Sequence, residues 1–197
     1  MVAVASNEPE GPASRRRRSV FRAVLVSVSA VLIGVVTSRL AGPLLARGEA
    51  VGAVGRGLTV FDNKRPAVAN LDPELLRAIR QAAKAAARDG VKISVNSGWR
   101  SPEYQDRLHL QAVWKYRSEA KAARWVATAD TSSHVSGDAV DIGPNRAIAW
   151  LSRHGAQYRL CQIYRNEPWH YELRPSAIVE GCPPMYADPG HDPRMQE

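Results

Sequence analysis

Two histidines and one aspartate in the second half of the chain are residue types that bind metal ions. His134 lies in a polar stretch typical of a loop, whereas Asp141 interrupts the apolar run at 139–142. A carboxylate in such a run is costly to bury unless it is paired or bound to a cation. His170 lies in a strand-like stretch flanked by aromatic residues. Two imidazoles and one carboxylate are sufficient for a catalytic zinc site that keeps its fourth position for water.

Glu167 is the residue best placed to use such a metal. It precedes His170 by three positions, and Pro168 between them stiffens the turn. The carboxylate can therefore reach a water at the metal without being a ligand itself. In metallopeptidases the metal lowers the pKa of that water and a carboxylate takes the proton. This pattern predicts a metal-assisted hydrolase.

Each of these residues also has a more ordinary interpretation. A single histidine is often structural, Asp141 could cap a turn or pair with an arginine, and Glu167 could be a solvated acid. Arg100 could simply stack on Trp99. Asp138 is a rival ligand four residues after His134, a spacing that suits a helix. The neighbouring glycine, serines and threonines make a helix improbable there, so Asp141 is preferred.

Three motifs surround these residues in a fixed order. They are Ser-Gly-Trp-Arg-Ser at 97–101, Ser-x-His-x-x-Gly-x-Ala-x-Asp at 132–141 and Glu-x-Trp-His-Tyr-Glu at 167–172. Together they resemble the VanY-type D-alanyl-D-alanine carboxypeptidases, over about residues 60–185. That zinc peptidase family also contains D-Ala-D-Ala dipeptidases and endolysin L-alanyl-D-glutamate endopeptidases. Trp99 stands where many relatives have tyrosine, a conservative aromatic change.

The resemblance implies a role for each matching residue. His134, Asp141 and His170 correspond to the ligands of one Zn²⁺ per chain. Glu167 corresponds to the general base, and Arg100 to the arginine that steadies the developing oxyanion. The implied reaction is hydrolysis of the terminal D-Ala-D-Ala bond of peptidoglycan stem peptides, with release of D-Ala. Endopeptidase or dipeptidase activity, and a zinc-bearing wall-binding module without catalysis, are the alternatives.

Two further residues are carried over from the family to the substrate cleft. Gln105 and Ser132 match positions that line this cleft, although a solvated helix residue and a loop hydroxyl are their ordinary interpretations. The family fold is a small α+β domain of the Hedgehog/DD-peptidase-like type. In that fold an antiparallel sheet with flanking helices carries the zinc site.

The hydrophobic pattern independently favours an α+β class. Asp72 and Pro73 begin a predicted helix that Gly90 ends, and Ser101 and Pro102 begin another. Helices are expected at 73–89, 102–126 and 146–153, strands at 91–95, 139–142, 160–164 and 169–173, a loop at 128–137 and an irregular chain after 175. The second helix is expected to bury Tyr104, Leu108, Val113 and Trp114. Early helices and short, late strands favour α+β over regular βαβ alternation.

The chain contains two cysteines, Cys161 and Cys182, which bracket the segment from Glu167 to His170. They do not form a CxxC pair, and no other cysteine could complete a thiolate zinc site. In the cytosol they would be two buried thiols, whereas an oxidising compartment would permit a disulfide. On an exported protein we expect the disulfide.

The N-terminal part of the chain indicates export. Four arginines at 15–18 precede residues 23–38, which carry no charge. This order is typical of a signal peptide or signal anchor. A helix over 23–38 spans about 24 Å, short of a hydrocarbon core of about 30 Å. An uncleaved single-pass anchor is preferred to a cleaved signal, and a buried core helix is the third alternative.

The expected organisation follows from these segments. Residues 1–19 are a basic cytoplasmic tail, 20–46 the signal anchor or signal peptide and 47–60 a linker, followed by the catalytic domain at 61–187 and an irregular tail at 188–197. The catalytic domain is expected outside the cytoplasm, tethered to the membrane or secreted, and monomeric.

Composition adds one exclusion. The chain is 45% hydrophobic and 23% charged, which is typical of a globular protein, and its net charge is +8. A basic protein can bind nucleic acid, anionic lipid or anionic wall polymer. No basic stripe interleaved with aromatic residues occurs in the folded part, so a nucleic-acid partner is not expected.

Overall fold

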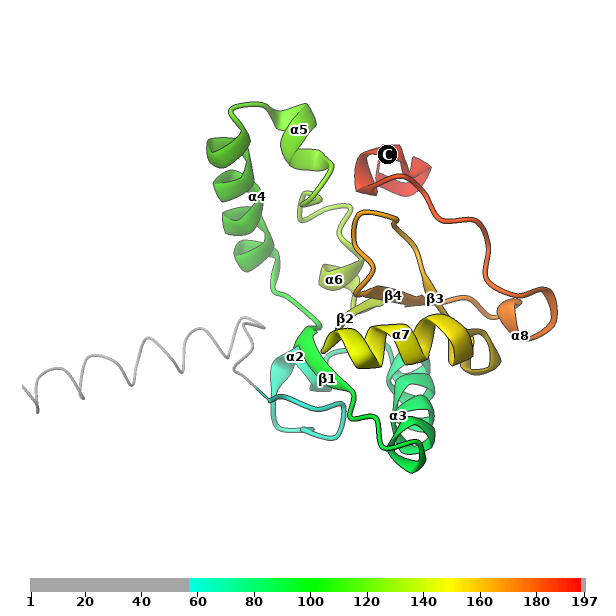
Figure 1. Ribbon diagram of the computed structural model, residues 1–197. Coiled ribbons are helices and arrows are strands. Elements are labelled where there is room, and N and C mark those ends of the chain that lie inside the picture. Colours follow the sequence, from blue (N-terminus) through cyan, green and yellow to red (C-terminus); the bar gives the residue numbers. More distant parts are fainter. Residues whose placement is uncertain (1–56, 196–197) are drawn as a thin grey trace, which may run out of the picture. The chain divides into compact units, whose positions relative to one another are not determined.

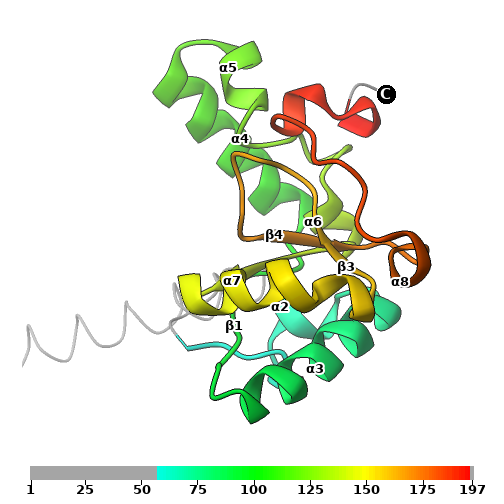
Figure 2. The same cartoon turned by 45° about the vertical axis from the view of Figure 1, so that its right-hand side comes forward.

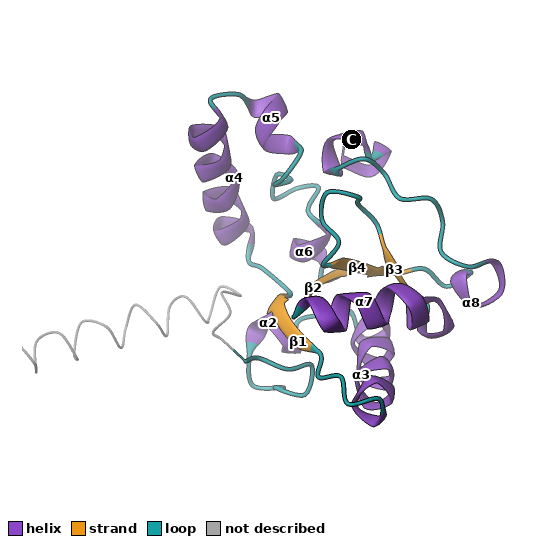
Figure 3. Cartoon of the chain, viewed as in Figure 1, coloured by secondary structure: helices purple, strands orange, loops and turns teal. Residues whose placement is uncertain are grey.

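The computed structural model describes residues 57–195, and the expected α+β class is confirmed (Figures 1 and 3). A four-stranded antiparallel sheet has the order β1-β2-β4-β3. The strands are β1 (Ser94–Ser97), β2 (Ala139–Gly143), β3 (Leu160–Gln162) and β4 (His170–Leu173). The helices are α2 (Pro66–Ala69), α3 (Pro73–Arg88), α4 (Pro102–Tyr116), α5 (Glu119–Ala123), α6 (Ser133–Ser136), α7 (Asn145–His154) and α8 (Ala177–Glu180).

The expected cytoplasmic tail and signal anchor lie outside the described residues. So does most of the expected linker. Within residues 57–195, no helix combines the length and the apolar character needed to cross a bilayer.

The two faces of the sheet have different functions. Alternate residues of a strand point to opposite faces, so Val140, Ile142 and Tyr171 enter the hydrophobic core. Helices α3 and α7 close this core on their side, while α4, α5, α6 and the C-terminal segment at 182–195 lie on the other side (Figures 1 and 2). The residues between, Asp141 and His170, consequently face away from the core.

Helix α3 is the main cover of the core and begins and ends as predicted. The Asp72 carboxylate accepts hydrogen bonds from the backbone N–H groups of Glu74 and Leu75, and Pro73 occupies the first turn. Its buried residues recur at helical spacing: Leu75, Ala78, Ile79, Ala82, Ala83, Ala85 and Ala86. Gly90 follows with a positive φ of 67°, a conformation that glycine adopts without steric cost.

The predicted single helix over 102–126 is wrong. Helix α4 ends at Tyr116, because the following residue, Arg117, adopts the left-handed conformation with φ 53°, and Ser118 caps the separate helix α5. Trp114, expected in the core, is 72% exposed. Tyr104, Leu108 and Val113 are only partly buried. The Ser-Glu pair at 118–119 was the overlooked signal, because serine followed by an acid is typical of a helix start.

Other boundaries also differ from the prediction. The expected loop at 128–137 contains the single turn α6, which Gly137 ends with a φ of 86°. Strand β1 starts only at Ser94. The segment expected to be an irregular tail contains 3-10 turns at Pro189–His191 and Pro193–Met195, and it carries two buried carboxylates, Asp188 and Asp192.

Candidate metal centre

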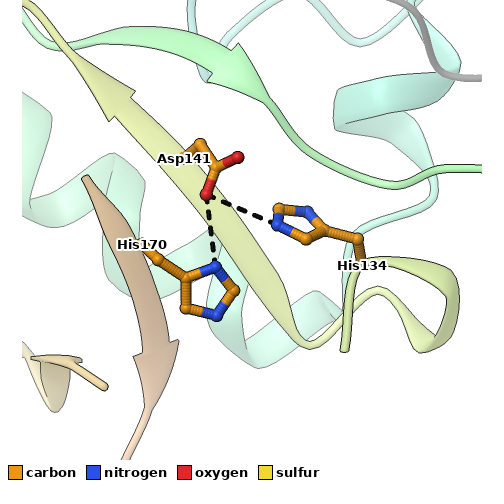
Figure 4. Close-up of side chains that lie close together, drawn as sticks. All are labelled: His134, Asp141 and His170. Atoms are coloured by element: carbon orange, nitrogen blue, oxygen red, sulfur yellow. Dashed lines mark hydrogen bonds and ion pairs between the residues drawn. The ribbon is translucent and has the colours of Figure 1, made fainter. Parts of the chain in front are cut away.

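His134, Asp141 and His170 converge from three elements, as Figure 4 shows. His134 comes from α6, Asp141 from β2 and His170 from β4. The register of the sheet pairs Asp141 directly with His170, so both side chains lie on one face. All three residues are buried, and one ligand atom of each lies within 4.8 Å of the others.

Both imidazoles direct a nitrogen at the same carboxylate oxygen. The Nε2 atom of His134 lies 3.4 Å from Oδ1 of Asp141, and the Nδ1 atom of His170 lies 3.2 Å from that oxygen. Asp138, the rival ligand considered from the sequence, is exposed and does not belong to this group.

The second nitrogen of each ring is already hydrogen-bonded. Nδ1 of His134 lies 2.8 Å from the carbonyl oxygen of Gly98, and Nε2 of His170 lies 3.1 Å from a carboxylate oxygen of Glu172. Both partners only accept, so these nitrogens carry the ring protons, and in a neutral ring the other nitrogen presents a lone pair. Two lone pairs facing one buried carboxylate favour a cation between them. Two imidazoles, one carboxylate and outer acceptors on both rings fit zinc.

The pKa values of His170 and Asp141 also favour a bound cation. Burial lowers the pKa of His170, but the neighbouring carboxylates of Asp141 and Glu172 outweigh this effect and raise the pKa to about 9. Burial raises the pKa of Asp141, yet the contacts with His134 and His170 hold it well below its usual range. The site therefore favours bound positive charge.

Glu167 lies beside the three ligands without joining them. The residue is 8% exposed, and its Oε2 lies 4.0 Å from Nδ1 of His170. Burial raises the pKa of Glu167 to about 7. A carboxylate with this pKa can exchange a proton near neutral pH.

Arg100 is held against the ligands by three side-chain hydrogen bonds. Its guanidinium donates to Ser97 Oγ at 2.9 Å, to Gln105 Oε1 at 3.0 Å and to Asp141 Oδ2 at 3.2 Å. Gln105 is 1% exposed and also donates to the carbonyl oxygen of Ala127. It is therefore not a solvated helix residue, and its contacts orient Arg100.

These residues line one cavity of about 300 Å³. Arg100, Gln105, Ser132 and Glu167 lie in its wall together with the three candidate ligands. The remaining wall contains residues that the sequence did not point to, among them Leu108, Trp125, Tyr164, Trp169, Pro189 and Met195.

A comparison with family models places the chain in a protein family. Residues 68–176 match the model of VanY, D-alanyl-D-alanine carboxypeptidase. The chain belongs to the VanY family. The predicted resemblance is thus confirmed, and all three sequence motifs lie within the matched stretch.

A curated relative and two solved structures extend this comparison. A D-alanyl-D-alanine carboxypeptidase of Enterococcus faecalis is 32% identical across a match that covers 44% of this chain and 42% of the relative, so the chain spans less than half of that protein. The structure of VanYB in complex with D-alanine-D-alanine has a TM-score of 0.51 at 27% identity, covering 56% of this chain and 74% of VanYB. The LD-carboxypeptidase LdcB shares the fold, with a TM-score of 0.50 at 23% identity, covering 56% of this chain and 63% of LdcB.

Sequence reasoning missed the role of Glu172, although the residue ends the third VanY-family motif. It lies two positions after His170 in β4, and such spacing places two side chains on the same face of a strand. This spacing was the available signal. Arg194, which contacts Glu172 at 2.8 Å, comes from the C-terminal segment. No motif or hydrophobic periodicity in the sequence predicted this contact.

The predicted disulfide between Cys161 and Cys182 is present. Cys161 lies in β3 and is the register partner of Glu172 in β4. The bond therefore fixes the start of the C-terminal segment next to the strand that carries His170.

Proposed function

We propose that the chain is a zinc-dependent D-alanyl-D-alanine carboxypeptidase that removes the terminal D-Ala from peptidoglycan stem peptides. The observation that carries the proposal is the convergence of His134, Asp141 and His170 in one cavity beside Glu167 and Arg100. Membership of the VanY family supports it.

In this mechanism His134, Asp141 and His170 would hold one Zn²⁺. A zinc ion in such a site acts as a Lewis acid and increases the acidity of water. Glu167 accepts the proton of the attacking water and later delivers it to the amine of the leaving D-Ala. Its raised pKa suits both steps, because a base that works near neutral pH must also release its proton there.

Arg100 provides positive charge where negative charge develops on the carbonyl oxygen of the scissile bond. Such charge is most effective when it is oriented before the reaction begins. Ser97 and Gln105 supply this orientation through their hydrogen bonds to the guanidinium. Ser132, which is buried in the cavity wall, is proposed to contact the peptide.

Product masses from defined peptides test the proposal. The purified chain, loaded with zinc, is incubated in parallel with stem pentapeptide, stem tetrapeptide and free D-Ala-D-Ala. Release of one alanine from the pentapeptide is the expected result. Cleavage inside the stem indicates an endopeptidase, cleavage of the free dipeptide alone indicates a dipeptidase, and no cleavage alongside peptide binding indicates a wall-binding module.

The location is proposed to be extracytoplasmic, with residues 20–46 as membrane anchor and the catalytic domain as a monomer. The disulfide supports this location because cytosolic thiols are kept reduced. Fractionation of cells that express the full chain tests the proposal. Recovery of catalytic domain in the membrane fraction, accessible to external protease, is expected. Recovery in the cytosol contradicts it.

A further inference from the structure

Glu172 is a buried carboxylate to which the proposed mechanism gives no chemical task. It is 1% exposed, and its Oε1 accepts the hydrogen bond from Nε2 of His170. An ionised carboxylate at this depth is stable only when it is paired with positive charge. The partners of Glu172 therefore determine whether its Oε1 atom keeps the hydrogen bond to Nε2 of His170.

Arg194 reaches Glu172 from the 3-10 turn at Pro193–Met195. Its Nη1 atom donates to Oε2 of Glu172 at 2.8 Å, and its Nη2 atom lies 3.5 Å from Oε1. The same guanidinium donates through Nε to Oδ1 of Asp192 at 3.0 Å and also binds Oδ2. Asp192 is fully buried. Arg194 is thus clamped between two buried carboxylates, with Arg174 as a second partner of Oε2.

Asp192 is also connected to the candidate ligand His170 through Tyr164. The hydroxyl group of Tyr164 donates to Oδ2 of Asp192 at 3.0 Å. The Tyr164 ring in turn packs against the His170 ring, with centroids 5.1 Å apart. His170 is consequently contacted by Glu172 at its Nε2 atom and by Tyr164 at its ring. Arg194 binds Glu172, and it also binds Asp192, the partner of Tyr164.

This arrangement includes two residues from outside the matched VanY region. The match ends at residue 176, so Asp192 and Arg194 lie beyond it. The C-terminal segment is nevertheless attached firmly to the rest of the domain. Asp188 accepts from Nε of Arg124 at 2.7 Å, and the disulfide fixes Cys182 to β3.

We propose that Arg194 is a positioning residue for the metal ligand His170 and that it acts through Glu172. By contacting both carboxylate oxygens, Arg194 keeps Oε1 at the Nε2–H group of His170, which aims Nδ1 at Asp141. The planar guanidinium suits this task because it can donate to two carboxylates at once, which an ammonium group cannot do in the same geometry. The proposal rests on the proposed function, since it requires a metal ion at His170.

Zinc affinity of the full-length chain, measured by competition with a chromophoric chelator, tests the proposal. Arg194→Met is expected to weaken zinc binding by about 10- to 100-fold, the range found when outer partners of metal ligands are removed. Arg194→Lys should restore the affinity only in part. Arg124→Met is the matched control, because it breaks a different ion pair of the C-terminal segment without touching Glu172, and it should keep near wild-type affinity.

A double-mutant cycle with Glu172→Gln separates positioning from general packing. If Arg194 acts through Glu172, Arg194→Met adds no further loss in the Glu172→Gln background. Unchanged affinity of Arg194→Met, an equal loss in both backgrounds, or an equal loss in Arg124→Met would each overturn the inference. Where Arg194→Met does not fold, as judged by thermal melting, Arg194→Lys takes its place in the cycle.

The wild-type measurement keeps the two proposals apart. If the wild-type chain binds no zinc, the proposed function fails. If it binds zinc and releases alanine while Arg194→Met matches it in affinity, only the role of Arg194 fails.

Discussion

At the scale of single residues, the site is made of groups that would be costly to bury alone. Asp141, Glu167 and His170 are each less than a tenth exposed. Their burial is tolerated because each has a charged or polar partner nearby. Of the two carboxylates, Glu167 is the less well compensated, because its pKa is raised whereas the pKa of Asp141 is lowered.

The base is tested by Glu167→Gln. We expect zinc content to stay at the wild-type level, because Glu167 is not among the grouped ligands. Turnover of the stem pentapeptide should fall by about two to four orders of magnitude, the range for loss of a general base. Glu180→Gln, a change to an exposed acid of α8, is the control. Near wild-type turnover in Glu167→Gln would mean that another group takes the proton.

The raised pKa of Glu167 also predicts how the stability of the metal-free protein depends on pH. The folded-state pKa is about 7, against 4.5 for the ordinary group. Between these values the unfolded chain has already lost the proton that the folded chain keeps, so this group makes stability decrease as pH rises. The difference amounts to about 3 kcal/mol above pH 7.

Chemical denaturation in chelator measures this effect. The free energy of unfolding of Glu167→Gln should exceed that of the wild type by up to about 3 kcal/mol at pH 8 and converge with it near pH 4. If the variant exceeded the wild type in free energy of unfolding by the same amount at pH 8 and at pH 4, the carboxyl group would not titrate between these pH values.

At the scale of elements, short segments of irregular backbone bring the proposed catalytic side chains to the sheet. The segment between β1 and α4 carries Arg100 and supplies the Gly98 carbonyl oxygen that binds His134. It packs closely on α2, since a Cβ atom on Gly98 would lie 2.0 Å from the carbonyl oxygen of Ala67. Only glycine permits this approach.

Gly98→Ala should therefore affect both stability and the metal. Backbone must move to admit the methyl group, at a cost of about 1–3 kcal/mol in the free energy of unfolding, and the carbonyl that orients His134 moves with it. We expect lower stability and weaker zinc binding, measured by denaturation and chelator competition. Gly90→Ala, at a positive-φ position with open space around it, should lower stability but leave zinc affinity unchanged. Equal zinc affinity in Gly98→Ala would contradict this role.

At the scale of the whole molecule, the site lies on the face of the sheet opposite the main hydrophobic core. The sheet buries Val140, Ile142 and Tyr171 on one face and presents the ligands on the other. Arg124 after α5 and Asp188 of the C-terminal segment form an ion pair, and each is followed in sequence by a residue of the cavity wall, Trp125 or Pro189. A metal bound by α6, β2 and β4 therefore links elements on the outer face of the sheet.

Metal removal should consequently lower global stability. A ligand at about 100 times its dissociation constant stabilises the folded state by about 2.7 kcal/mol, which corresponds to about 5–10 °C in Tm for a domain of this size. Thermal melting with zinc and with chelator measures the difference. His170→Ala should melt at the same temperature in both conditions. A shift of the wild-type size in that variant would place the zinc elsewhere.

The candidate site of this protein was predictable from its sequence because its residues stand in local patterns. Asp141 in an apolar run, Glu167 three residues before His170, and the order of the three motifs are visible without coordinates. The hydrophobic periodicity also predicted α3, α7 and the sheet strands, since burial on one face imposes that period. The break at Arg117 was missed because local capping competed with a continuous helical pattern.

Only the tertiary structure decided which residues support the ligands. Gln105 proved to be buried against Arg100, and Arg194 proved to bind Glu172 from a distance of 22 positions along the chain. Neither contact follows from periodicity, because hydrogen bonds between distant segments depend on how whole elements pack. Residue types and spacing predicted the candidate site, whereas long-range packing determined how its side chains are held in place.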